Sequence, residues 1–232
     1  MATLRIIGDV HGQVEVDDLL IGQTRPYLDL IADVPYSIQI GDMGDGQTYQ
    51  QLIAHVDPKR HRFFPGNHEY YVGLPPHSLG DFGAVQWGGV EFFFVRGAAS
   101  SDKEKLLRVG REHGRTLWFE QEEISEDQMR RAEAEYRQAK PTIMLTHDAP
   151  ADIARRVWDY SRQVKHSLPG AVFTPSRTNV FLSRLWGHHA PKLWVFGHHH
   201  CNWRTREGDT LFVCVGELGI LDIDPTGACA DG

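Results

Sequence analysis

Five short stretches of the chain hold aspartate, asparagine or histidine, residue types that bind divalent metal ions through oxygen or imidazole nitrogen. Mixed ligands of this kind suit manganese, iron or zinc, whereas a structural zinc site would use cysteine thiolates. The stretches offer seven candidate ligands, too many for one tetrahedral ion but enough for two ions that share a carboxylate. They are Gly8-Asp9-Val10-His11-Gly12, Gly41-Asp42-Met43-Gly44-Asp45-Gly46, Gly66-Asn67-His68-Glu69, Thr146-His147-Asp148 and Gly197-His198-His199-His200.

The spacing within these stretches predicts which side chains share a direction. Asp9 and His11 are two residues apart, and in an extended backbone such residues point to the same side. His198 and His200 have the same spacing, so both can face one cluster while His199 points away from it. The neighbouring glycines let the backbone turn sharply and approach the site closely.

Short apolar runs, typical of buried strands, lie before the polar stretches. Helical patterns at Thr48 to Val56 and at Ser125 to Ala139, the second opening with the capping-box pair Ser125 and Gln128, indicate an α/β fold. Ligands of open α/β sheets bind beyond the carboxyl ends of strands, so the five polar loops can converge. The expected strands are Leu4 to Ile7, Tyr36 to Ile40, Arg62 to Phe64, Phe92 to Val95, Thr142 to Leu145, Leu193 to Phe196 and Leu211 to Val215.

The composition is that of an ordinary globular chain of 232 residues, 41% hydrophobic and 24% charged, without a repeat or a linker. No apolar run approaches the roughly 20 residues that span a bilayer, and the N-terminus lacks a signal-peptide pattern. Three cysteines, an odd number, favour a reducing cytoplasm over a disulfide framework. A net charge of −7 argues against an extended nucleic-acid interface but not against small phosphorylated substrates.

The order D-x-H, G-D, G-N-H-E, a lone histidine and G-H-x-H, between residues 8 and 200, resembles that of the calcineurin-like metallophosphoesterases. The resemblance implies one domain over residues 1–232, a two-sheet β sandwich flanked by helices, with a dinuclear metal site at the strand carboxyl ends. It implies Asp42 as the bridging ligand and His68 as the catalytic histidine. The other implied ligands are Asp9, His11 and His200 for one metal and Asn67, His147 and His198 for the second.

Asp45 follows Asp42 as in the G-D-x-x-D-R-G pattern of the phosphoprotein phosphatase branch, where the second aspartate holds the catalytic histidine. The chain departs from that branch at Gly46 and Pro65, which replace arginines that contact phosphate. The resemblance therefore does not extend to that branch's specificity. Arg96, at the end of another strand, is a candidate phosphate contact in their place. The segments "RGAAS" and "LWFEQEEIS" resemble small bacterial and phage members of the superfamily.

The implied reaction is hydrolysis of a phosphoric ester, with a metal-bridging hydroxide as nucleophile and His68 as proton donor. Manganese is the expected metal, with iron, zinc, nickel or magnesium as alternatives. The favoured function is a phosphomonoesterase acting on a phosphorylated small molecule or phosphopeptide. The alternatives are a phosphodiesterase, acting on cyclic nucleotides, dinucleotides or nucleic-acid ends, and a non-catalytic scaffold. The scaffold ranks last because His68 and all seven ligand positions are present.

Several other polar residues are interpreted as structural. Glu69 is expected to accept hydrogen bonds rather than bind metal, and Asp148 to cap a turn. Ala98 to Glu123, which is polar and lacks periodicity, is interpreted as long surface loops that flank the site. The histidines expected to lie outside the metal cluster are His55, His61, His77, His113, His166, His188 and His189.

Overall fold

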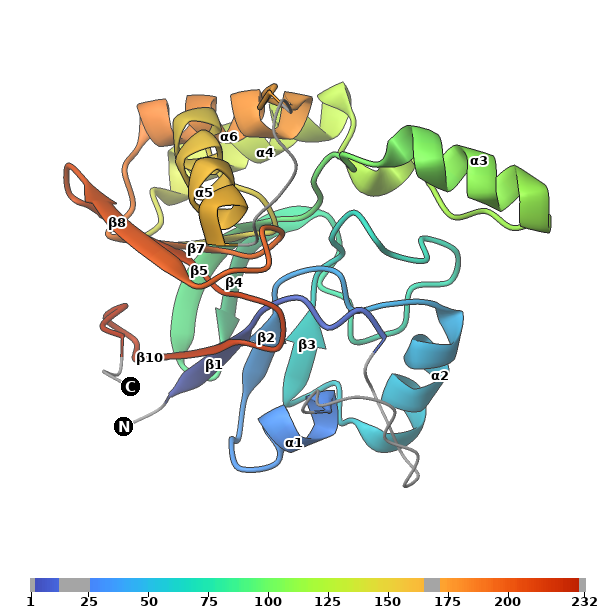
Figure 1. Ribbon diagram of the computed structural model, residues 1–232. Helices are drawn as coiled ribbons and strands as arrows, with labels where there is room; N and C mark the ends of the chain where they lie inside the picture. The colour runs from blue at the N-terminus through green and yellow to red at the C-terminus, as the bar shows by residue number, and fades with distance from the viewer. Residues whose placement is uncertain (1–2, 13–25, 165–171, 230–232) are drawn as a thin grey trace.

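The computed structural model describes residues 3–12, 26–164 and 172–229, which form two β-sheets packed face to face (Figure 1). The first sheet has the strand order β10 (Ile220–Ile223), β1 (Leu4–Ile7), β2 (Ser37–Gln39) and β3 (His61–Phe63). The second has the order β4 (Phe82–Trp87), β5 (Val90–Val95), β6 (Ile143–Thr146), β7 (Leu193–Phe196), β9 (Thr210–Cys214) and β8 (Trp203–Glu207). The α-helices are α1 (Tyr27–Ile31), α2 (Gly46–His55), α3 (Lys103–His113), α4 (Glu126–Ala139), α5 (Ala151–Val164) and α6 (Arg177–His188).

An apolar core fills the space between the sheets. Ile6 of β1 points into this core, and Ile7 points to the opposite face, towards α1 and α2. In β5, Phe92 and Phe94 face the core between the sheets, whereas Phe93 faces the helices on the other side. Since side chains alternate along a strand and both faces are covered, these strands read as continuous apolar runs.

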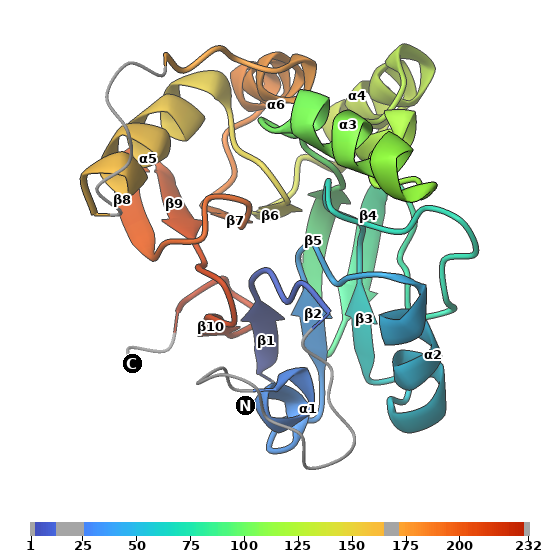
Figure 2. The ribbon, with the colours of Figure 1, turned by 45° about the vertical axis from the view of Figure 1, so that its right-hand side comes forward.

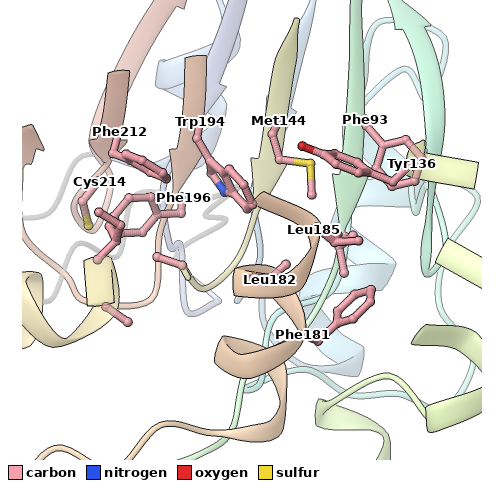
Figure 3. Close-up of a cluster of buried hydrophobic side chains, with 14 of the residues drawn as sticks. Phe93, Tyr136, Met144, Phe181, Leu182, Leu185, Trp194, Phe196, Phe212 and Cys214 are labelled. Atoms are coloured by element: carbon pink, nitrogen blue, oxygen red, sulfur yellow. The ribbon is translucent and has the colours of Figure 1, made fainter. Parts of the chain in front are cut away.

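Helices cover the outer faces of both sheets, α1 and α2 on the first and α4, α5 and α6 on the second (Figures 1 and 2). Figure 3 shows Trp194 of β7 and Phe212 of β9 in the cluster that also contains Leu182 and Leu185 of α6. The rings of Trp194 and Phe212 are stacked, with centroids 5.6 Å apart. The predicted class, an α/β two-sheet sandwich flanked by helices, is confirmed.

Parallel strands run through both sheets and bring their carboxyl ends to one edge of the sandwich. Strands β1, β2 and β3 are parallel to one another, and so are β5, β6, β7 and β9. The loops that follow β1, β2, β3, β6 and β7 contain the five polar stretches. The topology therefore explains why residues far apart in the sequence can form one site.

The seven expected strands are all present, with ends shifted by at most two residues. The capping box of Ser125 and Gln128 opens α4 as predicted. The expected loop from Ala98 to Glu123 was wrong in part, because it contains α3 and a 3₁₀ turn at Glu120–Glu122. Its lysine, glutamate, leucine and arginine residues favour a helix, which ends at Gly114 with φ of 62°. Only Gly110 of α3 is buried, so no apolar stripe marked this helix in the sequence.

Within the described part of the chain, no helix is both long enough and apolar enough to cross a membrane. None of the cysteines in these residues, Cys201, Cys214 and Cys229, forms a disulfide bond.

Candidate metal centre

Two contacts between the sheets bring their polar loops together. The backbone N–H of His198, after β7, donates to Asp9 Oδ1 at 3.1 Å. The imidazole Nδ1 of His147, after β6, lies 2.9 Å from the carbonyl oxygen of Ile40, at the end of β2. The side chains of both sheets therefore meet at the shared edge.

A first group of candidate ligands consists of Asp9, His11, Asp42 and His200, whose potential ligand atoms lie within 4.8 Å of one another. His200 Nε2 is 3.0 Å from Asp9 Oδ2. His11 Nε2 is 3.9 Å from Asp9 Oδ2 and 3.9 Å from Asp42 Oδ2. Three loops, after β1, β2 and β7, thus supply two carboxylates and two imidazoles to one small volume.

A second group, Asp42, Asn67, His147 and His198, adjoins the first. His147 Nε2 lies 3.0 Å from Asn67 Oδ1 and 3.3 Å from Asp42 Oδ1. The rings of His198 and His147 meet at an angle of 63°, with centroids 5.1 Å apart. Asp42 belongs to both groups, because Oδ1 faces His147 and Oδ2 faces His11.

The buried carboxylates at this edge have the unpaired atoms that a metal site requires. Asp9 and Asp42 are both fully buried. Oδ2 of each forms no hydrogen bond of acceptable geometry within the described residues, although His200 Nε2 is close to Asp9 Oδ2. Two buried carboxylates with unpaired oxygens are costly unless cations compensate them. The donor set and its unpaired oxygens therefore fit divalent metal ions.

The local electric field favours charged carboxylates here. Burial alone would raise the pKa of Asp42, but the positive charge of His147 and the other nearby imidazoles holds it well below its usual range. Burial alone would lower the pKa of His147, but the charge of Asp42 raises it to about 10. For His198, burial is the largest effect and lowers the pKa to about 4. A negative Asp42 is the state needed for metal binding.

The backbone of four candidate ligands is in the left-handed region. The φ angles are 53° for His11, 60° for Asp42, 67° for His198 and 51° for His200. Residues with side chains seldom adopt this conformation, and it clusters at functional sites. Asp9 and His11 do meet, but the expected reason, alternation in an extended backbone, was wrong for this turn. Gly66 allows the close approach, because a Cβ there would lie 2.1 Å from Asp42 Oδ1.

The sequence did not identify Ser100 and Glu122, which hold the amide of Asn67. Asn67 Nδ2 donates to Ser100 Oγ at 3.0 Å, and Ser100 Oγ donates to Glu122 Oε2 at 2.6 Å. The backbone N–H of Ser100 also donates to Glu122 Oε1, and Glu122 is buried. These hydrogen bonds fix which end of the Asn67 amide faces His147. The only signals in the sequence were the segments "RGAAS" and "LWFEQEEIS", which contain these residues.

His199 and Asp148 form a separate pair behind the ligand loops. His199 Nε2 lies 3.3 Å from Asp148 Oδ1. The expected reason for its direction, alternation in an extended backbone, does not apply, because His198 and His200 are both left-handed. Asp148 also accepts from the N–H of Ala149 and from Asn179 Nδ2, both at 2.7 Å. It therefore does more than cap a turn, since it joins the loops after β6 and β7 to α6.

Glu69 is a structural acceptor, as expected. It is buried and accepts from the N–H groups of Met43 at 2.6 Å, Gly44 at 3.3 Å and Gly66 at 3.4 Å. The hydroxyl of Tyr49 also donates to it, at 2.6 Å. Burial, together with the charge of Asp42, raises the pKa of Glu69 to about 7.

His68 and Asp45 both line a cavity beside the metal ligands, together with His11. His68 is half-buried, and its backbone N–H donates to Asp42 Oδ1 at 2.7 Å. Asp45 is the N-cap of α2, where Oδ1 accepts from the N–H groups of Gln47 and Thr48, each at 3.1 Å. Among the described residues, no hydrogen bond or ion pair joins Asp45 to His68. Their pairing stays a prediction.

Arg96 is buried in the interior. Its guanidinium donates to Asp81 Oδ1 and to the carbonyl oxygen of Gln121, both at 2.5 Å, and stacks on the ring of Tyr71. These bonds connect β5 to the segment before α4. Its role as a phosphate contact stays a prediction, and the bonds described here give it a structural role.

Most of the remaining histidines lie elsewhere. His61 Nδ1 lies 3.0 Å from Ser37 Oγ, and His77 Nε2 lies 2.8 Å from the carbonyl oxygen of Val56. His188 contacts Glu133, and His189 contacts the carbonyl oxygen of Pro141, which confirms that this pair is separate from the metal cluster. His55 and His113 are exposed, and His166 lies outside the described residues.

A comparison with known protein families identifies a matching family. The model of the calcineurin-like phosphoesterases matches residues 2–202. The chain belongs to this family. The matched region extends from before β1 to the residues just after His200, so it includes both candidate ligand groups.

Solved structures of other proteins are similar to the chain at low sequence identity. A dimetal phosphatase from Danio rerio is 12% identical, with a TM-score of 0.53, over 95% of this chain and 91% of that chain. A phosphopantetheinyl hydrolase from Mycobacterium tuberculosis is 15% identical, with a TM-score of 0.46, over 93% of this chain and 89% of that chain. No curated protein matches the chain significantly. At 12% identity the likeness to the Danio rerio structure is one of fold.

Proposed function

We propose that the protein is a metal-dependent phosphatase that hydrolyses phosphate monoesters of small molecules or phosphopeptides. The whole chain, residues 1–232, would act as one domain in the cytoplasm. Manganese is the proposed metal, because carboxylate, amide and imidazole donors suit it and cysteine is absent from the ligand positions. The proposed ligands are Asp9, His11 and His200 for one ion and Asn67, His147 and His198 for the other, with Asp42 shared.

The observation that carries this proposal is the position of Asp42. Its Oδ1 lies 3.3 Å from His147 Nε2, and its Oδ2 lies 3.9 Å from His11 Nε2. One carboxylate therefore presents an oxygen to each ligand group while buried away from water. A shared carboxylate between two ligand sets is the arrangement that a two-metal hydrolase requires.

Two divalent ions bound to these residues would supply a nucleophile, by lowering the pKa of a water molecule, and would offset the charge of the phosphoryl oxygens. His68 is the proposed proton donor to the departing oxygen. Its position supports this, because its ring lies 5.8 Å from that of His11 and it lines the cavity where a leaving group would lie. Asp45, with Oδ1 used by the α2 cap, would orient His68 through its other oxygen.

The test compares para-nitrophenyl phosphate with bis(para-nitrophenyl) phosphate, using protein loaded with manganese and the Asp42→Asn variant as the inactive control. The two esters share a leaving group, so their ratio reports on the number of ester bonds. Faster turnover of the monoester supports the proposal. Faster turnover of the diester would assign a phosphodiesterase instead. Turnover of neither ester by protein with both ions bound would indicate a non-catalytic scaffold.

A further inference from the structure

The cavity beside His11 and His68 has a volume of about 1080 Å³, far more than a phosphoryl group needs. The start of α2 forms one wall. The opposite wall is formed by Leu106 of α3 and by the segment that follows this helix. The lining residues that matter here are Asp45, Tyr70, Leu106, Arg115, Leu117 and Phe119.

The second wall belongs to a segment that we call the α3 arm, residues 103–119, whose helix projects from the body of the protein (Figure 1). Residues 103–115 contain five lysine or arginine residues and two glutamates, in a chain whose net charge is −7. The arm is therefore a basic element beside the candidate metal centre. Its base is fixed by the bonds of Ser100 and Arg96 to residues 121 and 122.

Arg115 is placed at the cavity by the turn that ends α3. Gly114 adopts a left-handed conformation, with φ of 62°, and reverses the chain. The N–H of Arg115 then donates to the carbonyl oxygen of Gly110 at 2.9 Å. A Cβ at Gly110 would lie 2.5 Å from the carbonyl oxygen of Arg115, so the turn packs directly on the helix.

Arg115 is the only lysine or arginine among the described residues that line the cavity. Its guanidinium is exposed and forms no ion pair or hydrogen bond with another described residue. Arg96, in contrast, uses its donors within the protein. A cation with free donors, on a residue that lines the cavity beside His68, suits an anionic group of a ligand.

The surroundings of Arg115 indicate the rest of that ligand. Leu106 and Leu117 line the same wall, and Tyr70 and Phe119 pack edge to face with ring centroids 5.8 Å apart. The acidic residues of the lining are Asp45, on the opposite wall, and Glu69, which is buried and hydrogen-bonded. The wall on the side of α3 therefore combines apolar side chains with one arginine, whereas the opposite wall, at the start of α2, is polar.

We infer that Arg115 is a specificity residue for phosphoesters whose leaving group carries a second anionic group, a phosphate or a carboxylate. This inference rests on the proposed function, because it takes the cavity beside His68 as the place of the leaving group. Arg115 would contact the second anion, while the apolar wall contacts the part of the leaving group between the two anions. Arg115 touches substrate only through the second anion, so its loss affects binding of such substrates rather than the reaction itself.

The test uses pairs of esters that differ only in the second anion. For a carboxylate the pair is 2-phosphoglycerate and glycerol 2-phosphate. For a phosphate it is adenosine 3′,5′-bisphosphate and adenosine 3′-monophosphate. Wild-type protein should have the lower KM for the doubly anionic member of at least one pair, and the pair that shows this identifies the anion. Arg115→Ala should raise that KM by up to about fivefold, the upper end of the range for an exposed charged contact, and leave kcat and the singly anionic member unchanged.

Arg111→Ala is the matched control, because it removes the same charge from the same arm at a residue outside the cavity lining. Equal effects of the two variants on KM would mean that the arm acts through its overall positive charge and not through a contact of Arg115. That result would overturn the inference. So would an Arg115→Ala variant that affects both members of each pair equally. Calorimetric binding of the same pairs gives a readout without turnover. Absence of turnover with preferential binding would contradict the proposed function alone, and turnover without any preference would contradict the inference alone.

Discussion

Nε2 of His11 lies 2.9 Å from Nε2 of His200, and Oδ2 of Asp9 lies beside both nitrogens. A neutral imidazole has one nitrogen that donates and one that accepts, so at most one proton can satisfy this contact. A cation bound by both lone pairs and by the carboxylate satisfies all three groups at once. This relationship between residues 189 positions apart is the local sign of a metal site.

Asp42→Asn should remove metal, whereas Asp45→Asn should not. Asp42 faces both ligand groups, so its loss leaves two cations with less shared negative charge. Asparagine at residue 45 can still cap α2, which keeps the helix intact. Metal analysis of the two purified variants decides between them. Equal loss of metal from both would mean that the bridging ligand is misassigned.

His68→Ala should keep both metals and slow turnover in a way that depends on the leaving group. The bond from the residue 68 N–H to Asp42 Oδ1 is made by the backbone and survives the change. A general acid contributes roughly 10²–10⁴-fold where the leaving oxygen is basic, and little for para-nitrophenolate. Phosphoserine turnover should therefore fall far more than that of para-nitrophenyl phosphate. If chemistry limits both reactions and both slow equally, His68 is not the proton donor.

Ser100→Ala should weaken metal binding at the second ligand group. The change leaves Asn67 Nδ2 without its partner and frees the amide to rotate. Loss of such a supporting bond typically costs about 10-fold to 100-fold in metal affinity. Manganese titration should show one of two binding steps weakened. Ser101→Ala, at the exposed neighbouring residue, is the control and should titrate like wild type. An unchanged titration for Ser100→Ala would assign the Ser100–Glu122 pair to loop structure only.

Burial of His61 should make the folded state less stable as the pH falls. Burial lowers its pKa to about 4, and its unfolded value is about 6.5. The unfolded state therefore binds more protons between these values, so stability is lost as the pH falls from 6.5 towards 4. One such group contributes a slope of up to about 1.4 kcal/mol per pH unit.

Urea unfolding of chelated protein across this range measures that slope. His61→Asn should unfold with a shallower dependence on pH than wild type, whatever its absolute stability. His55→Asn, at an exposed residue, should keep the wild-type slope. Identical slopes for all three proteins would exclude His61 as the titrating group.

Much of the candidate metal centre was predictable because metal binding restricts which residues can take part. Asp42, Asn67 and His147 belong to short stretches whose types and order are informative even before folding. Ser100 and Glu122 were not predictable, because serine and glutamate are common and meet only when residues 22 positions apart are brought together. The role of Arg96 likewise depends on Asp81 and Gln121, which no local pattern connects to it.

The secondary structure likewise contains elements that were evident in the sequence and elements that were not. Strands buried on both faces were evident as apolar runs, as in β5, where three phenylalanines are consecutive. Strand β8 has an exposed alternation, and α3 has almost no buried face, so neither produced a hydrophobic signal. The backbone at His11 was predicted to be extended, but it is left-handed. A left-handed backbone at a histidine is stabilised by its surroundings rather than by its own preference, so the local sequence does not reveal it.

The most direct test of the metal centre measures metal content and turnover in the same sample through chelation and return of metal. Protein purified with manganese should hold two ions per chain and hydrolyse para-nitrophenyl phosphate. Dialysis against a strong chelator should remove the ions and the turnover together, and added manganese should restore both in proportion. Full turnover by protein from which the metal has been removed would contradict a metal-dependent phosphatase.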